Sequence, residues 1–171
     1  ERGKLDEQLG IFLGDHKKTE IGRIIDLLEK RLGSWARGQI ILMVVVGLTN
    51  YLGLRLLGIP FALPLAILAG LLEIIPYIGP ILAAVPAVLI GFGISPVIGV
   101  AVAALAFLVQ QLENYIFVPT IMKKSAGVDP IITLLALAIG FKLAGVVGIL
   151  ISIHVFITLH LLVKEYITSK Q

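Results

Sequence analysis

Apolar residues recur every three or four positions between Thr19 and Arg37, and charged residues occupy positions between them. This spacing predicts a helix with one apolar and one charged face. Trp35 and Arg37 lie at the end of the stretch, where an aromatic ring beside a base is typical of a membrane interface. The pattern therefore predicts an amphipathic helix at the edge of a bilayer. Residues 1–18 show no clear period and predict no element.

The next segment, Gly38–Leu57, is apolar over about twenty residues. At ~1.5 Å per residue such a helix spans ~30 Å, which is the thickness of a hydrocarbon core. It is the most clearly predicted transmembrane helix in the chain. Arg55 lies near its end, where we expect its long side chain to reach the lipid headgroups.

Two shorter apolar segments follow. As helices, Pro60–Ile75 and Gly79–Phe92 would each reach only ~21 to 24 Å, less than a ~30 Å hydrocarbon core. We expect Pro64 and Pro86 to interrupt them. Two alternatives stay open: a pair of short, tilted spans, or a re-entrant helical hairpin whose tip is the turn at Pro76–Pro80.

Two further apolar segments complete the pattern. Pro96–Val118 predicts a helix that ends at Pro119, before the polar turn "KKSAGVDP". Pro130–Val163 has glycines and a lysine in its middle, which predicts two helices around a loop. These elements together predict an all-α fold: a polytopic transmembrane helical bundle with broken or re-entrant helices and an N-terminal amphipathic helix.

Composition supports a membrane protein. The chain is 58% hydrophobic and 15% charged, with a mean hydropathy of +1.03, which is far more apolar than a soluble domain of this length needs. The charges gather before residue 38. We therefore expect a cytoplasmic amphipathic or linker segment at 1–37, a transmembrane domain at 38–163 and a cytoplasmic tail at 164–171.

The distribution of bases predicts topology, because loops rich in Lys and Arg stay in the cytoplasm. We expect both ends of the chain to be cytoplasmic in a multi-pass protein of the inner or plasma membrane. The chain starts with Glu rather than Met, so we expect a piece of a longer protein. Nucleic-acid binding is not expected, because basic and aromatic residues are not interleaved. The bases placed in the cytoplasm are those of the N-terminal segment with Lys123, Lys124, Lys164 and Lys170.

Three charged residues, Glu73, Glu113 and Lys142, fall inside apolar segments. A charge at bilayer depth costs roughly 2.5 to 3.5 kcal/mol on insertion scales, so it is normally paired or faces water inside a bundle. Two interpretations stay open. One is a structural ion pair or an interfacial position, and the other is an ion or proton site on a transport path.

Gln110, Glu113 and Asn114 are spaced by three and four residues, so they are predicted to share one helical face. Such a face should meet protein or a water-filled cavity rather than lipid. Gly140, Gly145 and Gly148 allow either close helix packing or an unwound loop at "GFKLAG". Lys142 beside the glycines favours the loop.

Catalytic chemistry has little support in the sequence. His154 and His160 would point about 120° apart on a helix, and no H-E-x-x-H motif is present. Ser95 or Ser152 could pair with a histidine, but the sequence does not bring them together. The chain has no cysteine, which excludes cysteine-ligated metals. We predict no catalytic residue, no metal ligand and no cofactor.

Three stretches resemble one family. They are "LLEIIPYIGPILAAVPAVL", "QQLENYIFVPTIM" and "GVDPIITLLALAIGFKLAGVVGIL", and in order and spacing they look like the C-terminal half of the autoinducer-2 exporter family of bacterial and archaeal membrane proteins. The resemblance runs from about Ile21 to Leu162. It places the family's characteristic positions at Pro76, Gly79, Pro80, Gln110, Glu113, Asn114, Pro119, Pro130, Gly140, Gly145 and Gly148.

The resemblance implies efflux. Members of this family are associated with export of the quorum-sensing signal autoinducer-2, or act as antiporters that exchange Na⁺ or Li⁺ for H⁺. Homo-oligomers are also implied. The expected partners are therefore the lipid bilayer, a small-molecule or cation substrate and further copies of the chain, with H⁺ or Na⁺ as the coupling ion.

The leading hypothesis is a transport domain whose broken segments line a pathway, because irregular backbone at membrane depth lines cavities. Glu113 would be the proton or cation carboxylate, Gln110 and Asn114 its polar ligands, and Glu73 and Lys142 would lie nearby. The alternative is a non-transporting oligomeric membrane scaffold, in which the polar face holds subunits together. The predicted hinges or helix breaks are Pro76, Gly79, Pro80, Pro86, Pro119, Gly140, Gly145 and Gly148.

Overall fold

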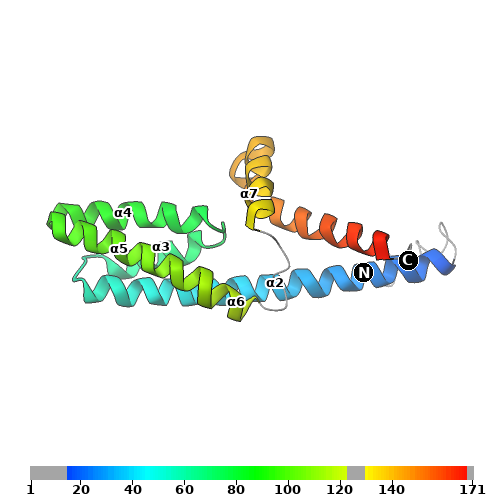
Figure 1. Cartoon of the computed structure of the whole chain (residues 1–171), viewed down its shortest axis with the longest axis horizontal. Helices are drawn as coiled ribbons and strands as arrows, with labels where there is room; N and C mark the ends of the chain where they lie inside the picture. Colours follow the sequence, from blue (N-terminus) through cyan, green and yellow to red (C-terminus); the bar gives the residue numbers. More distant parts are fainter. Residues whose placement is uncertain (1–14, 123–129, 169–171) are drawn as a thin grey trace. The chain divides into compact units, whose positions relative to one another are not determined.

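The computed structural model describes residues 15–122 and 130–168, and these residues form helices and turns with no strand (Figure 1). The predicted all-α fold is confirmed. The chain divides into two compact units. One is Trp35–Gly127, and the other combines Glu1–Ser34 with Val128–Gln171. This division follows packing, whereas the predicted division at residue 37 follows polarity and stays a prediction.

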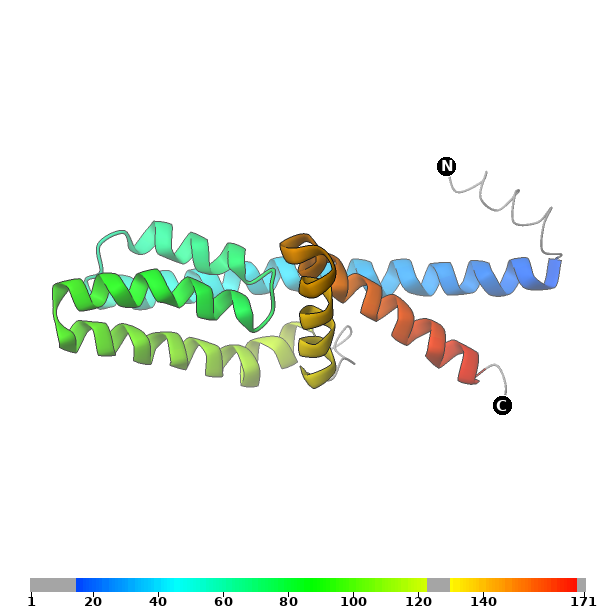
Figure 2. The ribbon, with the colours of Figure 1, turned by 90° about the horizontal axis from the view of Figure 1, so that it is seen from above.

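Helix α2 runs without a break from Asp15 to Leu56 (Figure 2). The predicted amphipathic helix and the first predicted span are therefore one helix. Gly38 lies at their junction and does not interrupt it. A Cβ at Gly38 would lie 2.6 Å from the Met122 sulfur, so this glycine permits close packing.

The unit Trp35–Gly127 holds a bundle in which α4 and α5 lie side by side and α3 packs on α4 (Figures 1 and 2). A π-helix, η1, follows α5 directly, and a short helix, α6, continues it. The elements of this unit after α2 are α3 (Ala62–Leu72), α4 (Ile78–Ile94), α5 (Pro96–Leu112), η1 (Glu113–Phe117) and α6 (Val118–Ile121).

The turn that ends α2 follows from Gly58, which adopts φ 68°. The Gly58 amide donates to the Arg55 carbonyl, and the Ile59 amide donates to the Leu54 carbonyl at 3.0 Å. These two bonds are the Schellman pattern, which needs a left-handed residue after the helix and places an apolar contact across it. Ile59 and Leu54 accordingly share one buried cluster.

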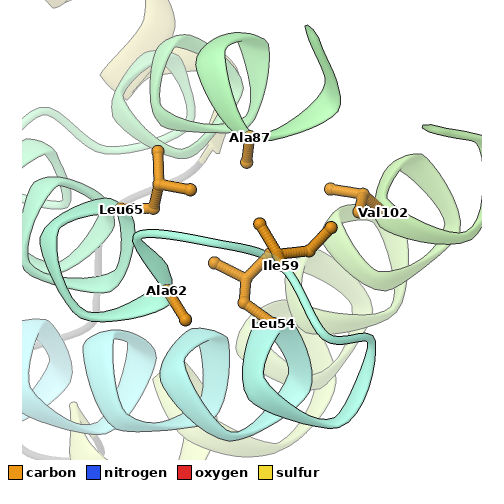
Figure 3. Packing of buried hydrophobic residues seen from close by; sticks show 6 residues of the cluster. All are labelled: Leu54, Ile59, Ala62, Leu65, Ala87 and Val102. Carbon is orange, nitrogen blue, oxygen red and sulfur yellow. The ribbon is translucent and has the colours of Figure 1, made fainter. Parts of the chain in front are cut away.

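That cluster forms the core between α2, α3, α4 and α5 (Figure 3). Its side chains come from all four helices and point toward one another, so they close the bundle near the α2–α3 turn. Small residues let the helices approach. Gly47 of α2 and Gly70 of α3 meet, and a Cβ at Gly70 would lie 2.7 Å from the Met43 carbonyl oxygen. The buried members are Leu54, Ile59, Ala62, Leu65, Ala87 and Val102.

Many large apolar side chains lie on the outside. Leu56 is 88% exposed, Leu143 81% and Val97 76%. Such a surface suits hydrocarbon rather than water. By length and hydropathy, Ile25–Leu56 and Pro96–Ile121 could each cross a membrane. The shorter apolar helices are Ala62–Leu72, Ile78–Ile94 and Ile132–Gly145.

The prediction that Pro64 and Pro86 interrupt their segments is wrong. Pro64 is the third residue of α3, where its missing N–H removes no helical bond. Pro86 lies inside α4, which continues on both sides of it. Prolines are tolerated within membrane helices because neighbouring groups can satisfy the freed carbonyl.

The second unit contains α7 (Pro130–Thr168), which is two helices joined at a sharp turn (Figure 1). Only Ala144 and Gly145 leave helical geometry, with φ −144° and 58°. The predicted pair of helices around a loop is therefore confirmed, although the loop is shorter than "GFKLAG" and leaves Lys142 helical. Gly140 and Gly148 pack closely, since a Cβ on either would overlap the carbonyl group of the other. Lys123, Lys124 and Lys170 lie outside the described residues.

Candidate functional site

The turn between α3 and α4 is built from Glu73 to Tyr77, within the break that the sequence predicts. The amides of Glu73, Ile74 and Ile75 still bond to carbonyls of α3, but Pro76 has no N–H and ends this series. Tyr77 has φ 66° and ψ −46°, and the Ile78 amide donates to the Pro76 carbonyl at 2.8 Å, so Tyr77 is the centre of a γ-turn of the rare, strained form, which costs about 1–3 kcal/mol. The surrounding fold holds this strained turn in place.

Gly79 explains how the two helices approach so closely at the turn. A Cβ there would overlap the Leu72 carbonyl oxygen, so only glycine fits. The Gly79 amide donates to the Ile75 carbonyl at 2.8 Å and starts α4. Pro80 follows as the third residue of α4, where no helical bond is lost. Gly79 and Pro80 thus shape the start of a helix, and the break itself lies just before them.

Gln39 of α2 makes a hydrogen bond to the turn. Its Nε2 donates a hydrogen bond of 2.7 Å to the Glu73 backbone carbonyl, and both residues are buried. A buried carbonyl at a helix end needs such a partner, because an unpaired one costs about 1–3 kcal/mol. The bond places the turn beside the N-terminal end of the apolar part of α2.

The Glu73 side chain is 0% exposed, and neither carboxyl oxygen has a hydrogen-bond partner among the described residues. Glu113 is 3% exposed, and its Oε2 is likewise unpartnered there. The two carboxyl groups lie close enough for their charges to interact. Two charged carboxylates that share a buried site repel each other, so one of them binds a proton or the pair binds a cation. The pair is therefore a candidate binding site for a proton or a cation.

Glu113 lies at the start of η1, where the helix widens by one residue. The Val118 amide bonds to the Glu113 carbonyl five residues back, which defines the π-turn. Single π-turns inside α-helices occur frequently at functional sites. Helical structure then continues through Pro119 to Ile121, so the predicted end at Pro119 is wrong. Pro119 falls in the first turn of the renewed α-helix, where proline is tolerated.

A cavity of about 20 Å³ lies between α2, α3, α4 and α5. Three of its lining residues are polar, namely Asn50, Gln110 and Glu113, and the others are apolar. A space of ~10–15 Å³ holds one water molecule if it has polar partners. Leu54, Leu65, Ala87 and Val102 belong both to this lining and to the core cluster in Figure 3.

The structure brings together three of the five residues predicted for the transport pathway. Glu73 and Glu113 interact, and Gln110 lies beside Glu113 with its Nε2 buried. Asn114 is exposed and does not line the cavity, so the predicted shared face holds only for Gln110 and Glu113. The shared face holds only in a regular α-helix, and the π-helix that begins at Glu113 changes the angular spacing after that residue. Lys142 is exposed on α7 in the other unit.

Sequence reasoning missed Gln39 and Asn50. Both interrupt the apolar segment Gly38–Leu57, and their separation of eleven residues is close to three helical turns. The signal was therefore a pair of amides on one face of a predicted span. Asn50 donates through Nδ2 to the Val46 carbonyl at 2.9 Å and lines the cavity.

The serines considered for catalysis have structural roles. The Ser95 side chain accepts a hydrogen bond from the Ile98 amide at 3.2 Å and caps α5. Ser152 donates to the Ile149 carbonyl at 2.7 Å. The side chains of His154 and His160 lie outside the described residues. Within the part of the chain that the structure describes, no three His, Asp or Glu residues form a group that could hold a metal ion.

Three curated proteins of Bacillus subtilis (strain 168) are similar to the chain, and each carries the name "Putative transport protein". YrrI is 31% identical over 84% of the chain and 40% of its own length. YueF is 31% identical over 81% of the chain and 38% of its own length. YtvI is 33% identical over 98% of the chain and 47% of its own length. No solved structure matches the chain.

The chain therefore spans less than half the length of these relatives. A family model described as AI-2E family transporter matches residues 2–168, which is nearly the whole chain. A match to a family of membrane transporters agrees with the apolar outer surface and with the two helices that are long enough to cross a bilayer. The chain belongs to the AI-2E family of membrane transporters.

Proposed function

We propose that the chain is the transport domain of an efflux transporter, which moves a small solute such as autoinducer-2, or Na⁺ or Li⁺, in exchange for protons. The observation that carries this proposal is the buried pair Glu73 and Glu113, of which Glu73 lies at a helix break and Glu113 at a π-turn. Transporters typically build substrate and coupling-ion sites from discontinuous membrane helices. No enzymatic activity is part of the proposal.

The energetics of the pair support a functional role. Replacing buried charged groups by apolar residues of similar size is often neutral or stabilising, so packing alone does not favour two buried carboxyls. Here three of the four carboxyl oxygens are buried without a hydrogen-bond partner among the described residues. A group that binds and releases a charged particle explains both features.

The orientation in the membrane is part of the proposal. Loops and ends rich in Lys and Arg stay in the cytoplasm. Lys30, Arg31 and Arg37 precede the apolar part of α2, so this end of the helix is assigned to the cytoplasm. The Glu73 turn, which Gln39 contacts, then lies toward the cytoplasmic side of a multi-pass protein in the inner or plasma membrane. We also propose that the transporter is a homo-oligomer.

The test is transport by the chain reconstituted in proteoliposomes, with autoinducer-2, Na⁺ and Li⁺ as separate substrates. Each is measured with and without an imposed proton gradient. We expect Glu113→Gln to abolish gradient-driven flux, because the amide cannot release a proton. Glu29→Gln, which alters an exposed acid on α2, is the matched control and should leave flux unchanged. Undiminished flux in Glu113→Gln, with the same pH dependence, would contradict the assignment.

The alternative is a non-transporting scaffold, favoured by the Gln39–Glu73 bond, in which buried polar groups tie helices together. The cysteine-free chain allows a direct distinction. Gln110→Cys places a thiol at the cavity, whereas Leu42→Cys places one in a buried cluster outside it. A pathway predicts that a water-soluble thiol reagent labels only the cysteine at 110. A scaffold leaves both thiols unlabelled.

A further inference from the structure

The lining of the cavity runs along the bundle. On α2 it consists of Val46, Asn50 and Leu54, which are spaced by four residues and therefore share one face of the helix. At ~1.5 Å per residue these three cover about 12 Å of the helix. The lining from α5 and η1 extends from Val102 to Glu113 and is longer still. Such a lining has the shape of a pathway rather than of a single contact point.

The two ends of the lining differ in polarity. Glu113 lies at one end, where it interacts with Glu73 of the α3–α4 turn. At the other end, Leu54, Leu65 and Val102 belong to the core cluster near the α2–α3 turn. Their side chains point toward one another in Figure 3 and are only 1–7% exposed. We call these three residues the apolar gate, because a hydrophobic constriction that excludes water can close a membrane pathway.

Polar groups inside the lining distinguish it from a packing defect, because cavities that stay empty are apolar. Glu113 is 3% exposed, and its Oε2 has no hydrogen-bond partner among the described residues. Asn50 lies halfway along the α2 lining, and its Nδ2 donates to the Val46 carbonyl at 2.9 Å. That bond uses one of the two N–H groups of the amide. Asn50 can therefore still bind a polar group inside the cavity.

The cavity is closed in this structure but is built from side chains that allow it to widen. Its volume of about 20 Å³ is little more than the ~10–15 Å³ that one water molecule needs. Small residues let neighbouring helices move without large side chains in the way. The alanines of the lining come from three helices and are Ala69, Ala83, Ala84, Ala87 and Ala106.

We propose that this cavity is the closed outer half of the transport pathway, that Asn50 binds a small polar solute halfway along it, and that the apolar gate opens to release the solute near the α2–α3 turn. The carboxyl pair then lies at the inner end of the same path. This inference rests on the proposed function, because it names the route and the gate that belong to the same site.

The experiment measures how fast a water-soluble thiol reagent, methanethiosulfonate ethyltrimethylammonium, labels Asn50→Cys in the full chain in lipid nanodiscs. The cysteine-free chain gives no background labelling. Adding Val102→Ala shortens a side chain of the gate, and we expect about tenfold faster labelling, because each buried methyl group that is removed lowers the cost of opening. Val100→Ala is the matched control on the same helix. Val100 is 61% exposed and lies outside the lining, so the rate should stay unchanged.

A second pair of variants keeps the test decisive if Val102→Ala does not fold. Leu65→Ala shortens the gate from α3, and Ile67→Ala on the same helix is its control, because Ile67 is 53% exposed and outside the lining. Leu42→Cys, in a buried cluster outside the cavity, reports general loosening of the bundle. We expect it to stay unlabelled in every background.

Two results would overturn the inference. One is equal labelling of Asn50→Cys with Val102→Ala and with Val100→Ala, which would make the three gate residues core only. The other is labelling of Leu42→Cys in the Val102→Ala background, because access would then not follow the cavity. Flux decides separately. Loss of flux in Glu113→Gln together with equal labelling rates contradicts only this inference, whereas retained flux contradicts the proposed function.

Discussion

The chain contains two helical hairpins, α3–α4 and α7, and their turns are formed in different ways. At the α3–α4 turn, a proline ends the helical hydrogen bonds, and a buried glutamine satisfies the carbonyl that is left. In α7 the turn consists of two residues, Ala144 and Gly145, and Gly145 has no neighbour that a Cβ would meet within 4 Å. Both hairpins use glycines for close approach, at Gly79 and at Gly148.

The difference teaches where a polar site can form. A turn that glycine alone makes possible needs no buried polar side chain, and α7 accordingly leaves Lys142 exposed at its break. The α3–α4 turn is packed against α2, and its freed groups must find partners inside the protein. Burial of Gln39 and Glu73 follows from that packing. The proposed transport chemistry therefore depends on the first hairpin, whereas the second has the glycine contacts of close helix packing.

The largest losses of stability should come from replacing the closely packed glycines that both hairpins contain. Gly79→Ala and Gly148→Ala each place a Cβ against a backbone carbonyl, which cannot move aside as a side chain can. We expect each to lower the free energy of unfolding by about 3 kcal/mol, the upper end for overpacking. The measurement is unfolding by SDS in mixed micelles. Gly93→Ala is the control, because nothing lies within 4 Å of its added Cβ. If Gly79→Ala were as stable as Gly93→Ala, the close approach of α3 and α4 would be disproved.

The next largest loss of stability should occur at the α3–α4 turn alone. Gln39→Leu removes the donor to the Glu73 carbonyl and leaves a buried acceptor unpaired, so we expect a loss of about 2 kcal/mol. Thr49→Val on the same helix is the matched control. Its hydroxyl donates to the Val45 carbonyl within α2, so this hydrogen bond does not join two elements and the loss should stay within about 0.5 kcal/mol. Equal losses in the two variants would mean that the turn does not depend on α2.

The smallest effect should appear at the α7 turn. Gly145→Ala introduces no clash but forces alanine into φ 58° and ψ −139°, a conformation that residues other than glycine rarely adopt, which we expect to cost at least about 1 kcal/mol. Gly22→Ala in α2 provides the comparison, because that glycine is helical and also has nothing within 4 Å. There alanine should stabilise by roughly 0.5–1 kcal/mol. The same SDS titration measures both, and a stabilising Gly145→Ala would show that the turn does not hold residue 145 at a positive φ.

Much of the fold was predictable because it depends on local signals. Hydropathy over Gly38–Leu57 predicted a membrane helix, and Pro76 with Gly79 predicted the break between α3 and α4. Those signals act through the backbone: proline lacks an N–H, and glycine lacks a Cβ. The same local rule failed at Pro86 and Pro119, where neighbouring structure tolerates a proline inside or after a helix.

The sequence indicated which residues belong to the candidate site, but it did not indicate which of them contact one another. Glu73 and Glu113 were evident as charges in apolar segments, since a charge at bilayer depth is costly wherever the chain folds. Their meeting depends on where α3 and α5 pack, and forty residues separate them along the chain. Asn114 failed as a cavity residue because η1 begins at Glu113, and the neighbouring side chain then faces outward.

The sequence by itself determined the membrane character of this protein, its helices and its two breaks, because hydropathy and the backbone properties of proline and glycine are local. Tertiary structure alone decided that Gln39 holds the first break, that Glu73 and Glu113 form one buried pair and that Lys142 stays exposed. Contacts between side chains distant in the chain depend on helix packing, which no local pattern encodes.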